Sequence, residues 1–344
     1  MKNKKPLLIT LIALGSLIAL LALVLCGAIG YFKLPVASYY AASDKAFVIP
    51  DIMSGYVPQG MHYCQEEEVL LLSGYRSDGA ASPVYVVEAG EQDHGKLLQK
   101  VTLKNEDGTD FVGHGGGIAK YGDFVYIAGD EAILYVYSFA DIMAAENGGS
   151  VKCKGSISLK VSDEDYLIPA FVTVYGDTLV VGEFYREEVY PTPVSHHMTT
   201  QAGDVHYALA VRFNLSESAE YGIDPQPNLA YSLPNQVQGM TFSPDGERVY
   251  LSTSWGLSFS HILEYDMTTL QKQGEITVLG KTVPLYAMDS ASLIQDHKIA
   301  PMSEEMAFVD GKLYVLSESA SSKYIFGRLT GGKWCYATDM EKMK

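Results

Sequence analysis

Hydrophobic and polar residues alternate along much of the chain, and tight turns interrupt the alternation. Residues 238–255, QGMTFSPDGERVYLSTSW, contain an apolar alternation, a Pro-Asp-Gly turn and a second apolar alternation. A period of two is typical of a strand with one buried face, and Asp-Gly supplies the positive φ that short hairpin turns need. The stretch therefore predicts a β-hairpin.

The same hairpin pattern occurs five times. The copies begin at Gln59, Gly116, Ala170, Gln238 and Glu304. Their equivalent positions lie 54 to 68 residues apart, at Gly60, Gly117, Phe171, Gly239 and Glu305. A third strand-like run follows each hairpin, and a fourth follows most of them. Four antiparallel strands in a tandem unit are the plan of a β-propeller, so we predict an all-β chain with five four-stranded blades.

The remaining strands are assigned from the runs that follow each hairpin. The expected third strands are SPVYVVEA, ILYVYSF, HYALAVRF, SHILEYDM and SKYIFGRL, and the expected fourth strands are KLLQKVTL, VKCKGSISL, LAYSLP and KQGEITVL. KAFVIPDI, residues 45–52, precedes the first hairpin and is expected to close the ring as the last outer strand. KWCYAT, near the C-terminus, competes for that place, and the sequence leaves the choice open.

The N-terminus has the composition of a membrane anchor. Residues 6–32 carry no charge, follow the lysine-rich MKNKK, and are long enough to cross a bilayer as a helix. The lysines predict residues 1–5 as a cytoplasmic stub, 6–32 as a transmembrane signal anchor, 33–44 as a linker and 45–344 as an extracytoplasmic propeller. This makes a single-pass protein of the cell membrane. Cleavage near Ala37 or Ala42 is the alternative, and a lipoprotein attached at Cys26 is a weaker one.

The net charge limits the possible binding partners, and the cysteine spacing indicates the state of the thiols. The formal net charge is −16, which argues against a nucleic-acid partner. Outside the anchor lie Cys64, Cys153 and Cys335, without CxxC or Cys/His spacing, so buried unpaired thiols are expected.

The hairpin FSPDGERVYLSTS resembles the blades of bacterial extracytoplasmic propellers of the YVTN and lactonase-like superfamily, over roughly residues 45–340. The blade starts VPQGM, HGGGIA and PMSEEM are also similar to those of a group of Gram-positive secreted propellers. The resemblance implies the fold. It implies no particular reaction, because propellers carry many functions.

Strand order predicts where a site lies. First-to-second turns such as YGD, SPDGE and VDGK are minimal, whereas the links on the opposite face are long and polar, including the one at residues 280–304. Loops of this kind commonly carry function. The candidate ligand-binding residues at this channel mouth are Gln59, His114, Glu183, His196, Gln238, Trp255, Glu304 and Glu318.

The candidates suit several kinds of site. Glu183, Glu304 and His114 are possible ligands of a divalent metal, although for any one of these side chains capping of a strand end is the favoured explanation. His196 lies in the longest link, and Tyr185, Tyr190 and Trp255 would provide a stacking platform for a sugar or peptide.

Two functions follow, and the sequence leaves open whether the protein is an enzyme. The first is an anchored binding or scaffolding module for an unknown extracellular ligand, such as a carbohydrate, cell-wall component or protein. The alternative is a metal-dependent hydrolase or lactonase-type enzyme at the channel mouth, with Glu304 expected to be partly solvated.

Overall fold

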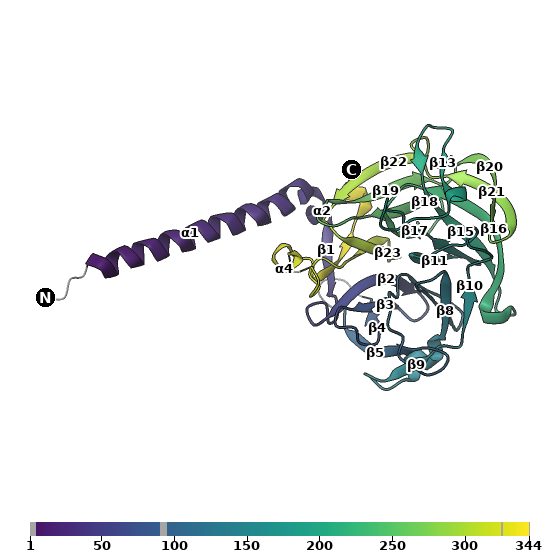
Figure 1. The fold of residues 1–344 in the computed structure, drawn as a ribbon, viewed down its shortest axis with the longest axis horizontal. Coiled ribbons are helices and arrows are strands. Elements are labelled where there is room, and N and C mark those ends of the chain that lie inside the picture. Colours follow the sequence, from purple (N-terminus) through teal and green to yellow (C-terminus); the bar gives the residue numbers. More distant parts are fainter. Residues whose placement is uncertain (1–4, 90–94, 325, 344) are drawn as a thin grey trace.

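The computed structural model describes residues 5–89, 95–324 and 326–343 (Figure 1). A long N-terminal helix, α1 (Lys5–Lys33), projects away from a ring of twisted sheets. Residues from Leu8 onward are apolar enough to cross a membrane, and the most apolar window has no buried residue. Lys2 and Lys4, on which the predicted orientation rests, lie outside the described residues.

Within the described residues the sheets form a five-bladed propeller, as the hairpin repeat predicts. The innermost strands of successive blades contact one another and close a circle. From the axis outward, the strands of blades 1 to 3 are β2 (Tyr56–Cys64), β3 (Val69–Arg76), β4 (Pro83–Glu88) and β5 (Leu97–Lys104); β6 (Ile118–Tyr121), β7 (Phe124–Ala128), β8 (Ile133–Ser138) and β10 (Gly155–Ser158); and β11 (Phe171–Tyr175), β12 (Thr178–Gly182), β15 (Ala208–Leu215) and β16 (Ile223–Leu233). Those of blades 4 and 5 are β17 (Val237–Phe242), β18 (Arg248–Thr253), β19 (Ser260–Asp266) and β22 (Leu293–Ile299); and β23 (Ser303–Val309), β24 (Lys312–Ser317), β25 (Trp334–Thr338) and β1 (Ser43–Val48).

Both competing segments take part in ring closure. The KAFVIPDI segment contributes β1, which is the outer strand of blade 5, so this prediction is confirmed. KWCYAT forms β25, the third strand, between β24 and β1. The expected third strand SKYIFGRL is wrong, because part of that segment is the short helix α4 (Gly327–Thr330). Phe326 there packs against Phe32 of α1, with ring centroids 5.2 Å apart, instead of entering a sheet.

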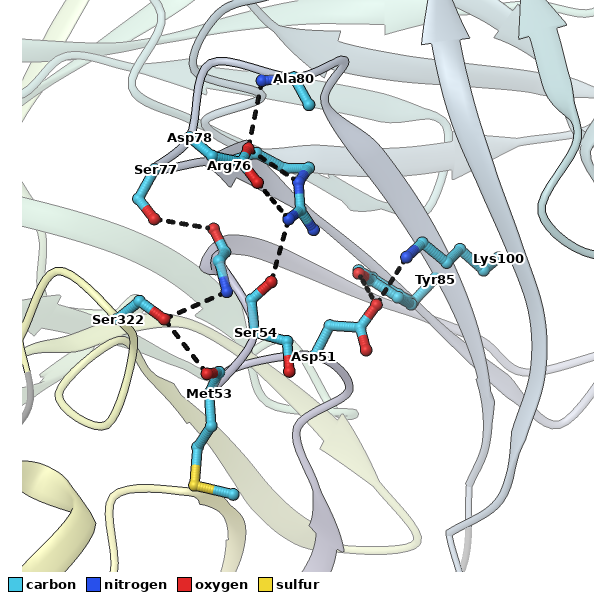
Figure 2. Close-up of polar contacts among 11 residues, drawn as sticks. Asp51, Met53, Ser54, Arg76, Ser77, Asp78, Ala80, Tyr85, Lys100 and Ser322 are labelled. Atoms are coloured by element: carbon cyan, nitrogen blue, oxygen red, sulfur yellow. Dashed lines mark hydrogen bonds and ion pairs between the residues drawn. The ribbon is translucent and has the colours of Figure 1, made fainter.

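The link from β1 to β2 is fastened to its surroundings by polar contacts (Figure 2). The Asp51 carboxylate accepts hydrogen bonds from Lys100 Nζ at 2.6 Å and from the Tyr85 hydroxyl at 2.9 Å. The Arg76 guanidinium donates to the Ser54 carbonyl at 3.0 Å. The link is therefore held against strands β3, β4 and β5 of blade 1.

Two predicted fourth strands pair differently from the prediction. VKCKGSISL divides into β9 (Ser150–Lys152), which adds to blade 1 parallel to β5, and β10 of blade 2. KQGEITVL is β20 (Gln271–Val278), which forms a hairpin with β21 (Lys281–Ala287) on the outer edge of blade 3. Strands β21 and β22 come from residues 280–304, so the prediction of a long polar link there is wrong. Blade 1 thus has five strands and blade 3 has six.

Glycines at equivalent positions let the blades meet closely at the axis. A Cβ on Gly117 would lie 2.2 Å from the Val172 backbone nitrogen, and one on Gly239 would lie 2.7 Å from the Cα of Glu305. Real Cβ atoms do not approach backbone this closely, so any larger residue would push neighbouring blades apart.

The hydrophobic core consists of layers between neighbouring blades. The segment expected as a linker contributes to one of them, through η1 (Leu34–Val36) and α2 (Ala37–Ala41). Val36 and Tyr39 are buried between blades 4 and 5. Cys64, Cys153 and Cys335 are buried and unpaired, as predicted.

The other elements are short; all lie in links between the strands of the blades except η4, which follows the last strand, β25. They are α3 (Phe139–Ala144), η2 (Val194–His196), β13 (Met198–Thr199), β14 (Val205–His206), η3 (Glu220–Gly222) and η4 (Met340–Met343).

Candidate functional site

Polar and aromatic side chains at the loop-rich face form two groups. The first, which we call the carboxylate cluster, consists of Gln59, Tyr75, Glu304, Glu318, Lys323 and Tyr324. The second, which we call the aromatic hollow, is a depression of about 120 Å³ lined by Tyr185, Arg186, Glu187, Tyr207, Asn235 and Gln236.

The carboxylate cluster joins blades 1 and 5. Gln59 in β2 donates from Nε2 to the Glu318 carboxylate at 3.3 Å. Lys323 Nζ donates to the Tyr75 hydroxyl at 2.7 Å, and lies 5.2 Å and 5.0 Å from the ring centroids of Tyr75 and Tyr324. Gln59, Glu304 and Glu318 were predicted from strand order, whereas Tyr75, Lys323 and Tyr324 were missed.

Burial sets the protonation of the two acids. Glu304 is only 2% exposed, so the expectation that it is partly solvated is wrong. Burial first, and then the nearby charges of Glu318 and Glu305, raise the pKa of Glu304 well above its usual range. Burial also raises the pKa of Glu318 to about 7, although Lys323 and the hydrogen bond from Gln59 act in the opposite direction. The neutral form of Glu304 is therefore favoured by its surroundings, and Glu318 titrates near neutral pH.

His114 lies at the edge of this cluster. Its ring centroid is 4.3 Å from that of Tyr75, and its Nδ1 is 3.6 Å from a carboxylate oxygen of Asp130. The His114 side chain is 52% exposed. It therefore joins the cluster through Tyr75, and its ring nitrogen faces Asp130.

Glu305, next to Glu304, is a buried acid that the site prediction did not include. One of its oxygens accepts from the Met240 backbone N–H at 2.9 Å and from the Met306 backbone N–H at 3.2 Å. The other oxygen is buried, and no described residue forms a hydrogen bond with it. Burial raises the pKa of Glu305 well above its usual range, despite these two backbone hydrogen bonds. The missing side chain of Gly239 makes room for this acid.

Glu183 and His196 form a buried pair on blade 3. His196 Nδ1 and a Glu183 oxygen are 2.8 Å apart, and the same oxygen accepts from the Leu209 backbone N–H at 3.0 Å. His196 lies in the long link between β12 and β15, yet its side chain is only 1% exposed. The other Glu183 oxygen and His196 Nε2 are buried and have no hydrogen-bond partner in the part of the chain that the structure describes. Burial raises the pKa of Glu183, and this effect outweighs the opposite effect of the hydrogen bond and charge of His196.

The aromatic hollow lies next to this pair in sequence. The rings of Tyr185 and Tyr207 are stacked, with centroids 4.7 Å apart and planes 22° apart, and the His197 ring meets both edge-on. Gln236 ties blade 4 to this loop, because its backbone N–H donates to the Tyr185 carbonyl at 3.2 Å. The predicted stacking residue Tyr185 thus lines a real depression.

Trp255 and Tyr190, the other two predicted aromatic residues, pack beside the hollow. The Trp255 ring lies 6.0 Å from Phe184 and 6.2 Å from Tyr190 by centroid. The Arg186 guanidinium lies 5.2 Å above the Trp255 ring. Among the described residues no carboxylate comes within ion-pair distance of Arg186, whose guanidinium packs on the Trp255 ring.

The predicted residues do not form one compact constellation. Gln59, Glu304, Glu318 and His114 are connected through Tyr75 and Lys323, whereas Glu183 pairs with His196 and Trp255 belongs to the aromatic group. Gln238 is half-buried in β17, without a side-chain hydrogen bond to the described part of the chain. In that same part no three His, Cys, Asp or Glu side chains are placed to hold a metal ion.

Comparisons with known proteins find similar solved structures at low sequence identity. No protein-family model and no curated protein sequence matches the chain. Among solved structures, a GH43_1 enzyme from Xanthomonas citri complexed with xylose is similar, with 12% identity, a TM-score of 0.44, and coverage of 88% of this chain and 92% of that one. The glutaminyl cyclase of Myxococcus xanthus matches with 10% identity, a TM-score of 0.40, and coverage of 83% and 90%. BamB from Moraxella catarrhalis matches with 10% identity, a TM-score of 0.31, and coverage of 75% and 82%.

At these values the neighbours carry no argument about function. The five-bladed architecture follows from the sheets of the chain itself. The more specific resemblance to the YVTN and lactonase-like superfamily stays a prediction.

Proposed function

We propose that the chain is a membrane-anchored propeller that binds an extracellular carbohydrate in the aromatic hollow of its loop-rich face. One observation carries the proposal: a depression of about 120 Å³ is bordered by the stacked rings of Tyr185 and Tyr207 and by polar side chains. Binding sites commonly combine apolar walls with a few polar groups that fix the orientation of the ligand.

The polar groups of the hollow suit a ligand with many hydroxyl groups. The side-chain oxygen of Asn235 is buried and accepts no hydrogen bond from the described residues, and a sugar hydroxyl would satisfy it. Arg186 and Gln236 offer N–H donors at the same depression. The tyrosine rings would contact the apolar C–H face of a sugar ring. Together these features favour a carbohydrate over a purely apolar ligand.

Packing of the segment after α1 supports an uncleaved anchor. Val36 and Tyr39 are buried in the core between blades 4 and 5, so cleavage near Ala42 would remove part of that core. We propose that residues 6–32 cross the cell membrane once and that the propeller lies outside. Protease added to intact cells should then degrade the propeller, which otherwise remains with the membranes. A protected domain, or a processed protein released from the membranes, would contradict the anchored topology.

The carbohydrate proposal is tested by calorimetry on the full chain in lipid nanodiscs, titrated with chitotetraose, cellotetraose and xylotetraose. We expect saturable binding of at least one sugar, weakened ten-fold or more by Y185A and by Y207A. The control is Y175A, which disrupts a similar stacked pair with Phe242, at 4.9 Å and 29°, beside a first-to-second turn on the opposite face. Equal loss in all three variants would refute a site in the hollow.

The metal-dependent hydrolase remains the alternative. Its best support is the adjacent pair of acids Glu304 and Glu318, which would need further oxygen ligands or water to hold a cation. Elemental analysis of the purified full chain tests it, since a stoichiometric divalent metal would favour this alternative.

A further inference from the structure

Lys323 is the built-in cation of the carboxylate cluster. Its ammonium group donates to the Tyr75 hydroxyl at 2.7 Å and lies about equally far from two tyrosine rings, at 5.2 Å and 5.0 Å. A cation within about 6 Å of an aromatic centroid is attracted to the ring face. The positive charge of Lys323 lowers the pKa values of both Glu318 and Glu304, which shows that the ammonium group favours the ionised form of each acid. Two tyrosine rings therefore flank one ammonium group, and two acids interact electrostatically with it.

This arrangement is poorly explained as a device for stability alone. Two acids buried close together repel each other when both are ionised, and that repulsion disfavours the folded state. Glu304 adds a carboxyl group that is 2% exposed and that accepts no hydrogen bond from the described residues. Buried groups with strongly shifted protonation are instead concentrated at functional sites. A ligand that carries positive charge would relieve the cost.

The loop that carries Lys323 is docked on the link between β1 and β2. The Ser322 hydroxyl donates to the Met53 carbonyl at 3.2 Å and accepts from the Gly55 N–H at 3.2 Å (Figure 2). Lys323 itself is exposed to solvent. Its backbone is thus held in place, while its flexible side chain is free to leave the rings.

We propose that Tyr75, Tyr324, Glu304 and Glu318 form a binding site for a primary ammonium group, which Lys323 occupies in the free protein. The ligand is an amine that displaces the lysine side chain: Tyr75 and Tyr324 would make the ring contacts and the hydrogen bond that Lys323 makes now, and the two acids would supply opposite charge nearby. Lys323 stays charged in this position. Burial lowers the pKa of Lys323, but the hydrogen bonds with Tyr324 and Tyr75 raise it by more, so the net shift is upward. It is accordingly a resident cation and a poor nucleophile.

The test is calorimetric titration of the full chain in lipid nanodiscs with n-butylammonium chloride, whose four-carbon amine matches a lysine side chain. Removing the resident cation with K323A should tighten n-butylammonium binding at least ten-fold relative to wild type. K323M, which retains an apolar stem over the rings, provides a second vacated site if K323A folds poorly. The matched control is K272A, which removes an exposed lysine of β20 and should bind as wild type does.

Two further measurements identify the site and its chemistry. Adding E318Q to K323M should weaken n-butylammonium binding five-fold or more, and n-butanol, which lacks the charge, should not bind. Equal affinity of wild type, K323A and K323M, or binding of n-butanol as tight as that of the amine, would overturn the proposal. No sugar enters this experiment, so its outcome is independent of carbohydrate binding in the aromatic hollow.

Discussion

Replacing Glu318 with glutamine should flatten the pH dependence of stability in a direction that the structure fixes. Folding raises the pKa of Glu318 from an ordinary value of 4.5 to about 7. A carboxyl group whose pKa is raised by folding contributes stability that is fully present below its unfolded pKa. That contribution is lost as the pH rises through the folded pKa. The wild type should therefore lose stability between about pH 4.5 and pH 7 through this group, and E318Q should not.

The size of the effect follows from the shift. At about 1.4 kcal/mol per pKa unit, the raised pKa corresponds to about 3 kcal/mol. For roughly 300 folded residues the entropy of unfolding is on the order of 0.6 kcal/mol/K, so the melting temperature should change by about 5 °C. Between pH 4.5 and pH 8.5 the wild type should thus lose about 5 °C more than E318Q. Glutamine keeps an oxygen that can accept the Gln59 hydrogen bond, so the variant should fold.

The assay is thermal unfolding of the full chain in detergent micelles, followed by near-UV circular dichroism at each pH. E247Q, which changes an exposed glutamate in the β17–β18 turn, is the control and should follow the wild-type curve. Parallel curves for wild type and E318Q would show that Glu318 titrates as it would in water. The raised pKa of Glu318 in the folded protein would then be wrong.

Three other outcomes follow from the packing. Y39A should lower stability by about 3–5 kcal/mol, because Tyr39 is a large, 2% exposed side chain between blades, and a melting temperature near that of wild type would contradict this. G117A should cost about 1–3 kcal/mol in the same assay, because its Cβ would lie 2.2 Å from the Val172 backbone nitrogen; an unchanged melting temperature would mean that the axis is looser than described. Cys64, Cys153 and Cys335 are buried, so mass spectrometry should find iodoacetamide on them only after unfolding, and rapid labelling of the folded chain would argue against the assigned core.

Local patterns predicted the blades because hairpins are local. Alternation and Asp-Gly or Gly-Asp turns lie within some fifteen residues, and Gly117 and Gly239 mark the places where blades meet. Outer strands were harder to assign, since their blade depends on partners far along the chain. The sequence of β20 alternates as the true fourth strands do, yet it pairs with β21 beside blade 3. Strand β22 has few buried residues, so its composition is like that of a polar link.

Only those residues of the candidate site that lie at strand ends could be predicted, because strand order places them on one face. Gln59 and Glu318 lie where a first strand begins and a second strand ends, and the structure brings their side chains together. The same rule, applied to the end of β3, would have found Tyr75. Strand order could not predict Lys323, because the position of its loop depends on the hydrogen bonds between Ser322 and the β1–β2 link. The burial of Glu304 also required the packing of neighbouring blades, which no local pattern contains.

The most direct test of carbohydrate binding uses the fact that the chain has only two tryptophans. Trp255 lies beside the hollow under Arg186, whereas Trp334 is in β25, with Lys45 and Lys333 over its ring. In the full-chain W334F variant, fluorescence therefore reports on Trp255 alone. Titration with chitotetraose, cellotetraose and xylotetraose should produce a saturable change in emission with at least one sugar, and Y185A should abolish the change. No saturable change with any of the three sugars up to about 10 mM, a concentration at which even binding of about −4 kcal/mol would be detected, would contradict the proposed site.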